Sequence, residues 1–392
     1  MDADNFEFSF MDFDLFEVAR NGCISVLNIA LDNLDIYDFS VDTQDRNGNS
    51  LLHYVASAGN VETAKKLISL GAYTNILNGK GASPLHSACE HGHLDLAKLL
   101  LAHNSKLNSV DFLGETPLFK AVRGGNKQLT KFLISCHAVV NNANKIDERL
   151  MHLAVAYDDE ELVEVLLGVG QDPNVVSGCG ETPIQLAIKT SNSSMLNLLI
   201  KGNANTRIRD HNNSTLLHLA VKQMDQTICQ TLISHGLEVN AKDCEGSTPL
   251  HSAVEANSAA MVKLLLDNQA DINLADHDDY TPLHLAARNF NGVEVLELLL
   301  KNKARSDLKT YCGDLPLHIA AAVGNTRGFI ALYSKKYLNC MNKMGLTACQ
   351  LAEQEGHTVI VQLNYRLDKN DSVNHKIPVL KQLHGSRRSI AK

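Results

Sequence analysis

A chain of 392 residues is long for one hydrophobic core, so its length predicts two or three domains or a repeat array that grows in one dimension. The hydrophobic share of 44% is ordinary for a soluble chain, and the absence of Trp with only 8 Pro favours an all-α body. Residues 366–392 are basic, which leaves about −13 of charge on the rest and excludes general nucleic-acid binding.

The N-terminal segment, residues 1–12, alternates acidic residues with phenylalanines such as Phe6, Phe8 and Phe10. This composition is typical of short acidic motifs that fold on a partner, and a disordered end is the alternative. Because Met1 to Glu17 contain no Lys or Arg, we expect no secretory signal peptide there. The nine cysteines contain no C-x-x-C pair. We therefore expect an intracellular protein, cytoplasmic or alternatively nuclear, with reduced cysteines.

Internal repetition is the strongest feature of the chain. A divergent capping repeat is predicted over residues 13–45, and a regular array over residues 46–367. The apolar residue of a T-P-L-H-like tetrad recurs with a 33-residue period, then after 34 and 32 residues. These positions are Leu52, Leu85, Leu118, Met151, Ile184, Leu217, Leu250, Leu283, Leu317 and Cys349.

Each copy has the pattern of a helical hairpin. In the copy that begins at Ser83, this serine suits a helix cap, Pro84 suits the first turn, and Gly92 ends the helix. The following LDLAKLLL places Leu96 and Leu100 on one face of a second helix. Neither helix is long enough to be stable alone, so each pair must pack against the next copy.

The two fullest copies are residues 247–273, STPLHSAVEANSAAMVKLLLDNQADIN, and residues 280–307, YTPLHLAARNFNGVEVLELLLKNKARSD. They resemble the ankyrin repeat, and the resemblance extends over about eleven copies. It implies a solenoid of helix-turn-helix pairs with short β-hairpin-like turns. It also implies that turn tips and first helices line a concave surface that binds proteins.

Two sets of recurring residues are interpreted as structural. The tetrad histidines lie about one repeat apart, too far for one metal ion, and the resemblance implies that they join adjacent turns by hydrogen bonds. Phe119, Gln185 and Gln350 replace them in three copies. A turn glycine precedes each tetrad, and Asp147, Asn213 and Asp279 take its place in three copies.

A candidate binding patch remains after these positions are removed. Phe112, Leu113 and Ile146 are apolar residues at turn tips that are otherwise polar or small. Arg123 and Tyr157 stand at outward positions of the neighbouring first helices, and both residue types are favoured interface anchors. We predict that repeats 4 and 5 form the main binding surface, and the alternative is that these tips pack on their neighbours. Phe290 and Tyr311 are a weaker second candidate.

Three positions are predicted modification sites. Asn240 and Asn273 each follow a leucine by eight residues and resemble ankyrin asparagines that can be hydroxylated. Ser389, after two arginines in the basic C-terminal tail of residues 368–392, is a candidate for phosphorylation. The tail itself is predicted to be solvated or to contact acidic surfaces.

The sequence predicts a non-enzymatic adaptor that binds one or more proteins on its concave face. An inhibitory or regulatory subunit that blocks a partner is the alternative, and an enzyme is a remote one, since no catalytic motif is visible. Asn78 to Ser83 only faintly resembles a phosphate loop, because Lys80 is followed by Gly81. No cofactor, metal or membrane insertion is expected, and the chain is predicted to be monomeric.

Overall fold

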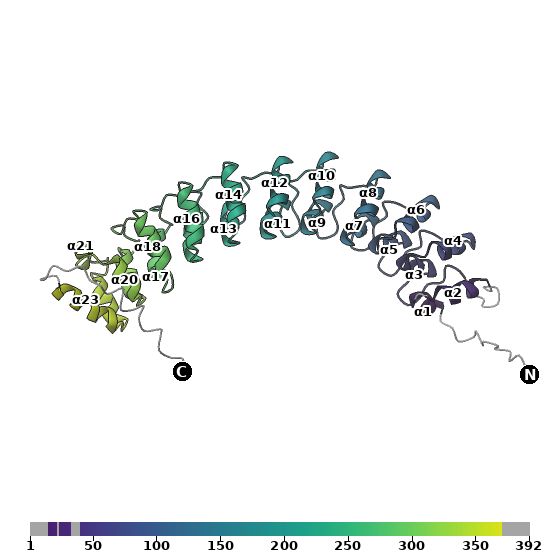
Figure 1. Cartoon of the computed structure of the whole chain (residues 1–392). Coiled ribbons are helices and arrows are strands. Elements are labelled where there is room, and N and C mark those ends of the chain that lie inside the picture. The colour runs from purple at the N-terminus through teal and green to yellow at the C-terminus, as the bar shows by residue number, and fades with distance from the viewer. Residues whose placement is uncertain (1–14, 22, 33–39, 371–392) are drawn as a thin grey trace, which may run out of the picture. The chain divides into compact units, whose positions relative to one another are not determined.

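The computed structural model describes residues 15–21, 23–32 and 40–370, which form helices joined by turns (Figure 1). Contacts divide the chain into two units, residues 1–206 and 207–392. The described residues form 23 helices and only isolated antiparallel bridges, such as Gln44 with Ser50. The all-α prediction is therefore confirmed, together with the hairpin-like turns.

Unit 1 contains six helix pairs, those of repeats 1 to 6. From the second pair onward the first helix starts directly after a turn, and in every pair the second helix packs on the first. The helices are α1 (Leu15–Arg20), α2 (Ile24–Leu31), α3 (Leu51–Ala58), α4 (Val61–Ser69), α5 (Pro84–Glu90), α6 (Leu94–Ala102), α7 (Pro117–Arg123), α8 (Lys127–Ser135), α9 (Leu150–Ala156), α10 (Glu160–Gly168), α11 (Pro183–Lys189) and α12 (Ser193–Lys201).

Unit 2 contains five further pairs and one additional short helix. The helices are α13 (Leu216–Lys222), α14 (Gln226–Ser234), α15 (Pro249–Glu255), α16 (Ala259–Asp267), α17 (Pro282–Arg288), α18 (Val293–Lys301), α19 (Pro316–Ala322), α20 (Thr326–Leu332), α21 (Lys335–Leu338), α22 (Ala348–Gln354) and α23 (Thr358–Asn370). The helix α21 lies where repeat 10 is one residue short. The last helix ends at Asn370, inside the segment assigned to the tail from sequence.

The turns confirm the predicted left-handed positions. Every turn glycine named by the repeat pattern has a positive φ, for example 78° at Gly114 and 79° at Gly246. The three substitutes share this conformation, with φ of 54° at Asp147, 59° at Asn213 and 62° at Asp279. Asn and Asp tolerate this region better than most residues, so the turn persists where glycine is missing.

The core lies between successive helix pairs within each unit. In repeat 3, Leu85, Ala88, Leu96 and Leu100 are fully buried, and α5 packs against both α3 and α7. Small residues such as Ala88 allow this close approach. The predicted hairpin and its buried leucines are confirmed.

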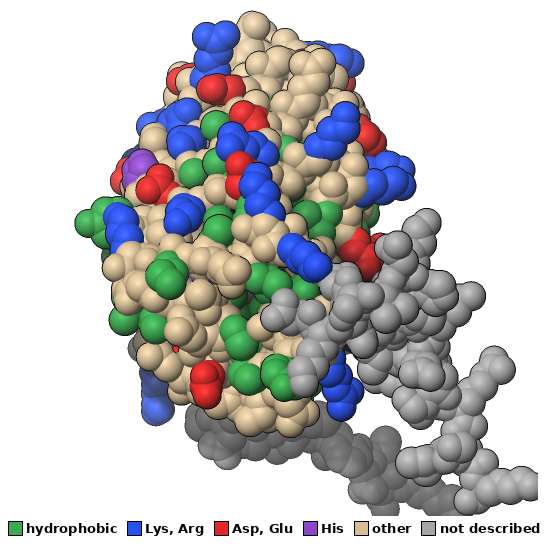
Figure 2. Space-filling view, turned by 90° about the vertical axis from the view of Figure 1, so that its left-hand side faces the viewer, with side chains coloured by type: hydrophobic (Ala, Val, Ile, Leu, Met, Phe, Trp, Pro, Cys, Tyr) green, Lys and Arg blue, Asp and Glu red, His purple; other side chains and the backbone are tan. Residues whose placement is uncertain are grey.

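The end of unit 2 that carries α23 is less completely covered. Figure 2 shows hydrophobic side chains among Lys and Arg side chains on this face. The exposed apolar residues of the last copies are Met341, Met344, Val359 and Tyr365. Within the described part of the chain, every helix is too short or too polar to cross a lipid bilayer.

Candidate functional site

The turn tips of unit 1 are joined from one repeat to the next by backbone hydrogen bonds. The Phe112 N–H donates to the Lys80 carbonyl at 2.8 Å, and the Lys145 N–H donates to the Leu113 carbonyl at 2.8 Å. Phe112 and Leu113 therefore lie beside the next tip, which carries Ile146. The structure brings the three predicted apolar tip residues together on adjacent turns.

These three side chains face solvent. Phe112 is 62% exposed, Leu113 60% and Ile146 66%. Phe112 also packs on its neighbour, since a Cβ on Gly81 would lie 2.6 Å from the Phe112 ring. Phe112 is therefore exposed, as a binding residue would be, and also packs on the neighbouring turn, as the alternative proposed.

Arg123 is more constrained than the sequence suggests. Its Nη2 donates to Glu115 Oε1 at 2.6 Å and to Glu148 Oε2 at 2.9 Å, and 39% of the side chain remains exposed. Long side chains on a helix point back toward its N-terminus, which explains how Arg123 reaches the base of the turn. The guanidinium therefore links repeats 4 and 5 near the apolar tips.

A buried charge cluster lies beneath Arg123, and the sequence gave no expectation of it. Lys120 Nζ contacts Asp111 Oδ2 at 3.0 Å and Glu115 Oε2 at 2.7 Å. The Lys120 side chain is 11% exposed and the two acidic side chains 3%. Burial works to raise the pKa of Glu115, but Lys120 and Arg123 outweigh it and lower that pKa. All three groups are therefore charged.

A signal for this cluster was present in the repeat pattern. Lys120 occupies the fourth position of its helix, and five other copies have leucine at this position. Those leucines are Leu153, Leu186, Leu219, Leu285 and Leu351. A charge at an aligned half-buried position requires a partner, and the acids before the helix supply it.

Tyr157 is separate from the tips. It is the half-exposed residue that follows α9, at the end of the helix opposite the turn. Seven helical residues lie between, so Tyr157 is roughly 10 Å along the helix from the tip end. A partner that contacts both must extend along the first helix.

The tetrad histidines occupy the predicted structural role. In His251, Nδ1 accepts from the Thr248 N–H at 3.1 Å and Nε2 donates to the Tyr280 carbonyl at 3.1 Å. The same Nε2 contact to the next repeat is made by His53, His86, His152, His218, His284 and His318. Burial lowers the pKa of these imidazoles, so they are neutral.

Comparison with known proteins agrees with this geometry. A family model described as ankyrin repeats, in three copies, matches residues 15–111, 103–177, 150–243, 238–310 and 283–374. The chain belongs to the ankyrin repeat family. No curated protein matches the sequence.

Many solved structures share this ankyrin fold, since 591 chains match. One is the ankyrin repeat domain of Bcl-3, which is described as a unique member of the IkappaB protein family. It is 28% identical, with a TM-score of 0.51, and the match covers 56% of this chain and 98% of that domain. A fold found so widely supports protein binding as the general activity without selecting one partner.

The two asparagines singled out for hydroxylation belong to a larger ankyrin row. Asn240 Oδ1 accepts from the Asp271 N–H at 2.8 Å, and Asn273 Oδ1 accepts from the Arg305 N–H at 2.9 Å. Equivalent bonds to the next repeat are made by Asn75, Asn108 and Asn174. The 33-residue spacing of these asparagines could have revealed this stacking role. Their hydroxylation stays a prediction.

The remaining candidate residues lie at exposed positions or outside the described residues. Phe290 and Tyr311 are both exposed, and Lys343 Nζ lies 4.3 Å from the centre of the Tyr311 ring. Ser389 and the N-terminal segment lie outside the described residues. Among the residues with described positions, no three His, Cys, Asp or Glu side chains come together as a metal site.

Proposed function

We propose that this chain is a non-enzymatic adaptor that holds a protein partner on the turn tips and first helices of repeats 4 and 5. The observation that carries the proposal is the group of adjacent exposed tips formed by Phe112, Leu113 and Ile146. Exposed apolar side chains that are contiguous and rimmed by polar residues are typical of interaction sites.

The charge cluster below supports the same location. Arg123 is held by Glu115 and Glu148, so its half-exposed guanidinium is already ordered before a partner arrives. An anchor that is rigid in the free protein loses less conformational entropy on binding. Tyr157 extends the surface along the first helix of repeat 5.

Loss of the apolar tips tests the proposal. Leu113→Ser with Ile146→Ser should lower partner capture in cells by at least about tenfold, because central apolar anchors dominate binding energy. The matched control is Leu77→Ser with Val176→Ser, two apolar residues that are 51% and 52% exposed on other turns of unit 1. A protein captured by both variants as by the parent does not bind at this patch. If the tip variant captures every partner as well as the parent does, the proposal is refuted.

An inhibitory or regulatory subunit is the second candidate. It is favoured by the likeness to the Bcl-3 domain, whose description places it in the IkappaB protein family. A one-to-one complex that silences the partner's activity would select this role. An adaptor would instead hold two proteins simultaneously.

The proposal places a monomeric adaptor in the cytoplasm, with the nucleus as the alternative compartment. Sedimentation of the purified chain and imaging of a fluorescent fusion test these two points. An enzyme remains the remote alternative, and a hydrolase and transferase screen tests it. Turnover that survives purification to homogeneity would contradict the non-enzymatic assignment.

A further inference from the structure

The tips of repeats 2 to 5 form a basic edge. Arg46, Lys80 and Lys145 are exposed there, and within the described residues none of them has an ion-pair or side-chain hydrogen-bond partner. Asp147 is the one acidic residue exposed at these tips in the described part of the chain. Three uncompensated cations on one edge attract an acidic ligand.

The carboxylate closest in sequence to Arg46 does not compensate it. Asp45 Oδ1 accepts from the N–H groups of Asn47 and Asn49, both at 2.8 Å. Asp45 Oδ2 accepts from Tyr54 Oη–H at 2.5 Å and lies 3.5 Å from Arg20 Nη2. Both oxygens of Asp45 are therefore occupied within the fold.

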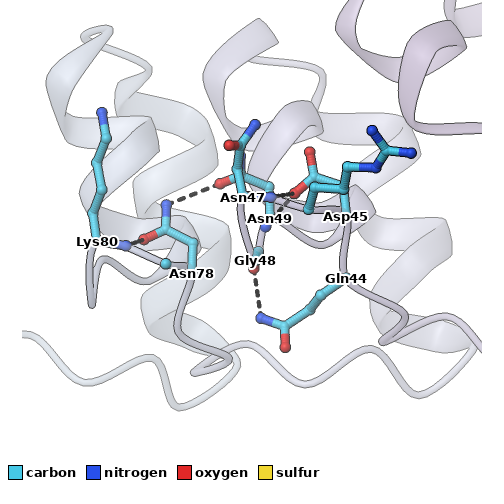
Figure 3. A pocket seen from close by; sticks show the side chains of 9 residues that line it. Gln44, Asp45, Asn47, Gly48, Asn49, Asn78 and Lys80 are labelled. Carbon is cyan, nitrogen blue, oxygen red and sulfur yellow. Dashed lines mark hydrogen bonds between the residues drawn. The ribbon is translucent and has the colours of Figure 1, made fainter.

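A hollow of about 810 Å³ lies between the turns of repeats 2 and 3 (Figure 3). Figure 3 shows Lys80 extending from the tip on one side, with the turn around Gly48 on the other. A Cβ on Gly79 would lie 2.6 Å from the Asn47 carbonyl oxygen, so the two turns approach closely beside the hollow. The hollow is lined by polar side chains and glycines, among them Gln44, Asn49 and Asn78.

Residues 1–14 of this chain, which lie outside the described residues, have the complementary chemistry. They contain five acidic residues, four phenylalanines and no Lys or Arg. The acids are Asp2, Asp4, Glu7, Asp12 and Asp14. An acidic segment is complementary in charge to the basic tips, and its carboxylates suit the polar lining of the hollow.

The described chain begins in repeat 1, one repeat before the turns that line this hollow. Leu15 starts α1, which packs against α3, and Arg20 of α1 contacts Asp45 in the turn of repeat 2. First helices elsewhere start directly after their turn, so the start of α1 lies on the turn side of the stack. Residues 1–14 are thereby tethered at the same edge.

We propose that residues 1–14 bind along the tips of repeats 2 and 3. The acids that flank Phe6, Phe8 and Phe10 contact Arg46 and Lys80 beside the polar hollow. The reach is sufficient, since these phenylalanines are five to nine residue steps from Leu15, which span about 17 to 30 Å in an extended chain. Successive repeats are only about 10 Å apart.

This inference does not rest on the proposed partner site of repeats 4 and 5. The hollow belongs to repeats 2 and 3, and its occupant is the chain's own segment. Tethering makes the contact intramolecular, so weak individual contacts suffice at the high effective concentration of a short linker. The N-terminal segment thus acts as a built-in ligand for the first tips.

Photo-crosslinking of the full chain tests this contact. With p-benzoyl-phenylalanine in place of Phe8, we expect crosslinks to residues 44–49 and 78–80. Arg46→Glu with Lys80→Glu should lower their yield about tenfold, because two attractive contacts become repulsive. The same charge change by Lys65→Glu and Lys98→Glu, on the second helices of the same repeats, should leave the yield unchanged.

Two further arms make the result decisive. Asp4→Lys with Glu7→Lys should restore the crosslink in the Arg46→Glu, Lys80→Glu chain, and circular dichroism verifies that each variant is folded. Mixing isotopically heavy and light copies separates contacts within one molecule from contacts between two. Crosslinks mainly between copies, crosslinks mapping elsewhere, or a yield insensitive to Arg46 and Lys80 would each overturn the proposal.

Discussion

The contact between repeats 8 and 9 in unit 2 and the contact between repeats 4 and 5 in unit 1 use different chemistry for the same stacking. In the first, neutral His251 joins the Thr248 backbone to the Tyr280 carbonyl. The bond from the Thr248 N–H exists only while the imidazole is unprotonated, because Nδ1 must accept. Protonation would therefore break this bond within repeat 8, whereas the Nε2–H donor to the Tyr280 carbonyl would remain.

Between repeats 4 and 5, Phe119 replaces the histidine and is fully buried. It has no polar atom, so Arg123 crosses to Glu148 instead, above the buried pair of Lys120 and Glu115. Hydrophobic burial and ion pairs here replace a neutral hydrogen bond. The comparison shows that successive repeats stack at the same spacing although different side chains make the contact. The contact made by ion pairs is the one that lies at the proposed binding patch.

The largest effect is expected from Lys120→Met. It leaves Asp111 and Glu115 buried with only Arg123 as counter-charge, so unfolding free energy should fall by about 3 to 5 kcal/mol. Urea denaturation measures the change. Lys98→Met, which removes an exposed lysine from its pair with Asp95, is the control and should cost below about 0.5 kcal/mol. A Lys120→Met chain as stable as the parent would show that the cluster contributes no stability.

Acid should destabilise the fold at the tetrad histidines, because burial disfavours the protonated imidazole. Burial lowers the pKa of His284 from 6.5 to about 4, so the unfolded chain takes up the proton first. The stabilisation is complete above pH 6.5, declines as the pH falls, and its loss is complete below about pH 4, reaching about 3 kcal/mol.

His284→Gln is the variant that isolates this effect, because glutamine stands naturally at the same position in Gln185 and Gln350 and keeps the bond to the helix cap. The variant should be less stable than the parent near neutral pH, and the difference should shrink as the pH falls toward about 4. Denaturation curves at several pH values measure it. A constant difference would contradict the assigned titration.

The sequence was sufficient for the regular positions and insufficient for the exceptions. The turn glycines and their substitutes such as Asp147 followed from the period because each copy repeats the same local geometry. The histidine contacts were implied by the resemblance to the ankyrin repeat. The Lys120 cluster did not, because it depends on three side chains meeting in one repeat. Arg123 was predicted as an outward interface anchor, and its bond to Glu148 was not predicted, because it is a contact between copies. The apolar tips were predicted because exposure depends only on their position in the turn.

Asn273→Ala should have a smaller effect. It removes the acceptor for the Arg305 N–H, which leaves one backbone donor of the next repeat dependent on water, and should cost about 1 to 2 kcal/mol. Asn212→Ala, at an exposed tip, is the control and should be near neutral. Intact mass of the protein from cells tests the separate prediction of hydroxylation at Asn240 and Asn273, which would add one oxygen atom at each. If Asn273→Ala leaves the free energy of unfolding unchanged, this row of asparagines does not stabilise the stacking of repeats.

The smallest effect is expected from Arg123→Lys, which keeps the charge but shortens the reach toward Glu115 and Glu148. Because the guanidinium is 39% exposed, solvent screens the pair, and the loss of stability should be only about 0.5 to 1 kcal/mol. The loss should shrink at high salt, since added ions weaken exposed pairs first. Arg288→Lys is the control, because its pair with Glu255 is exposed and 3.9 Å long. If the loss of stability in both variants changes equally with salt, the contact between repeats 4 and 5 does not depend on the Arg123 ion pair. The difference between the two kinds of contact then depends on Phe119 and the buried Lys120 alone.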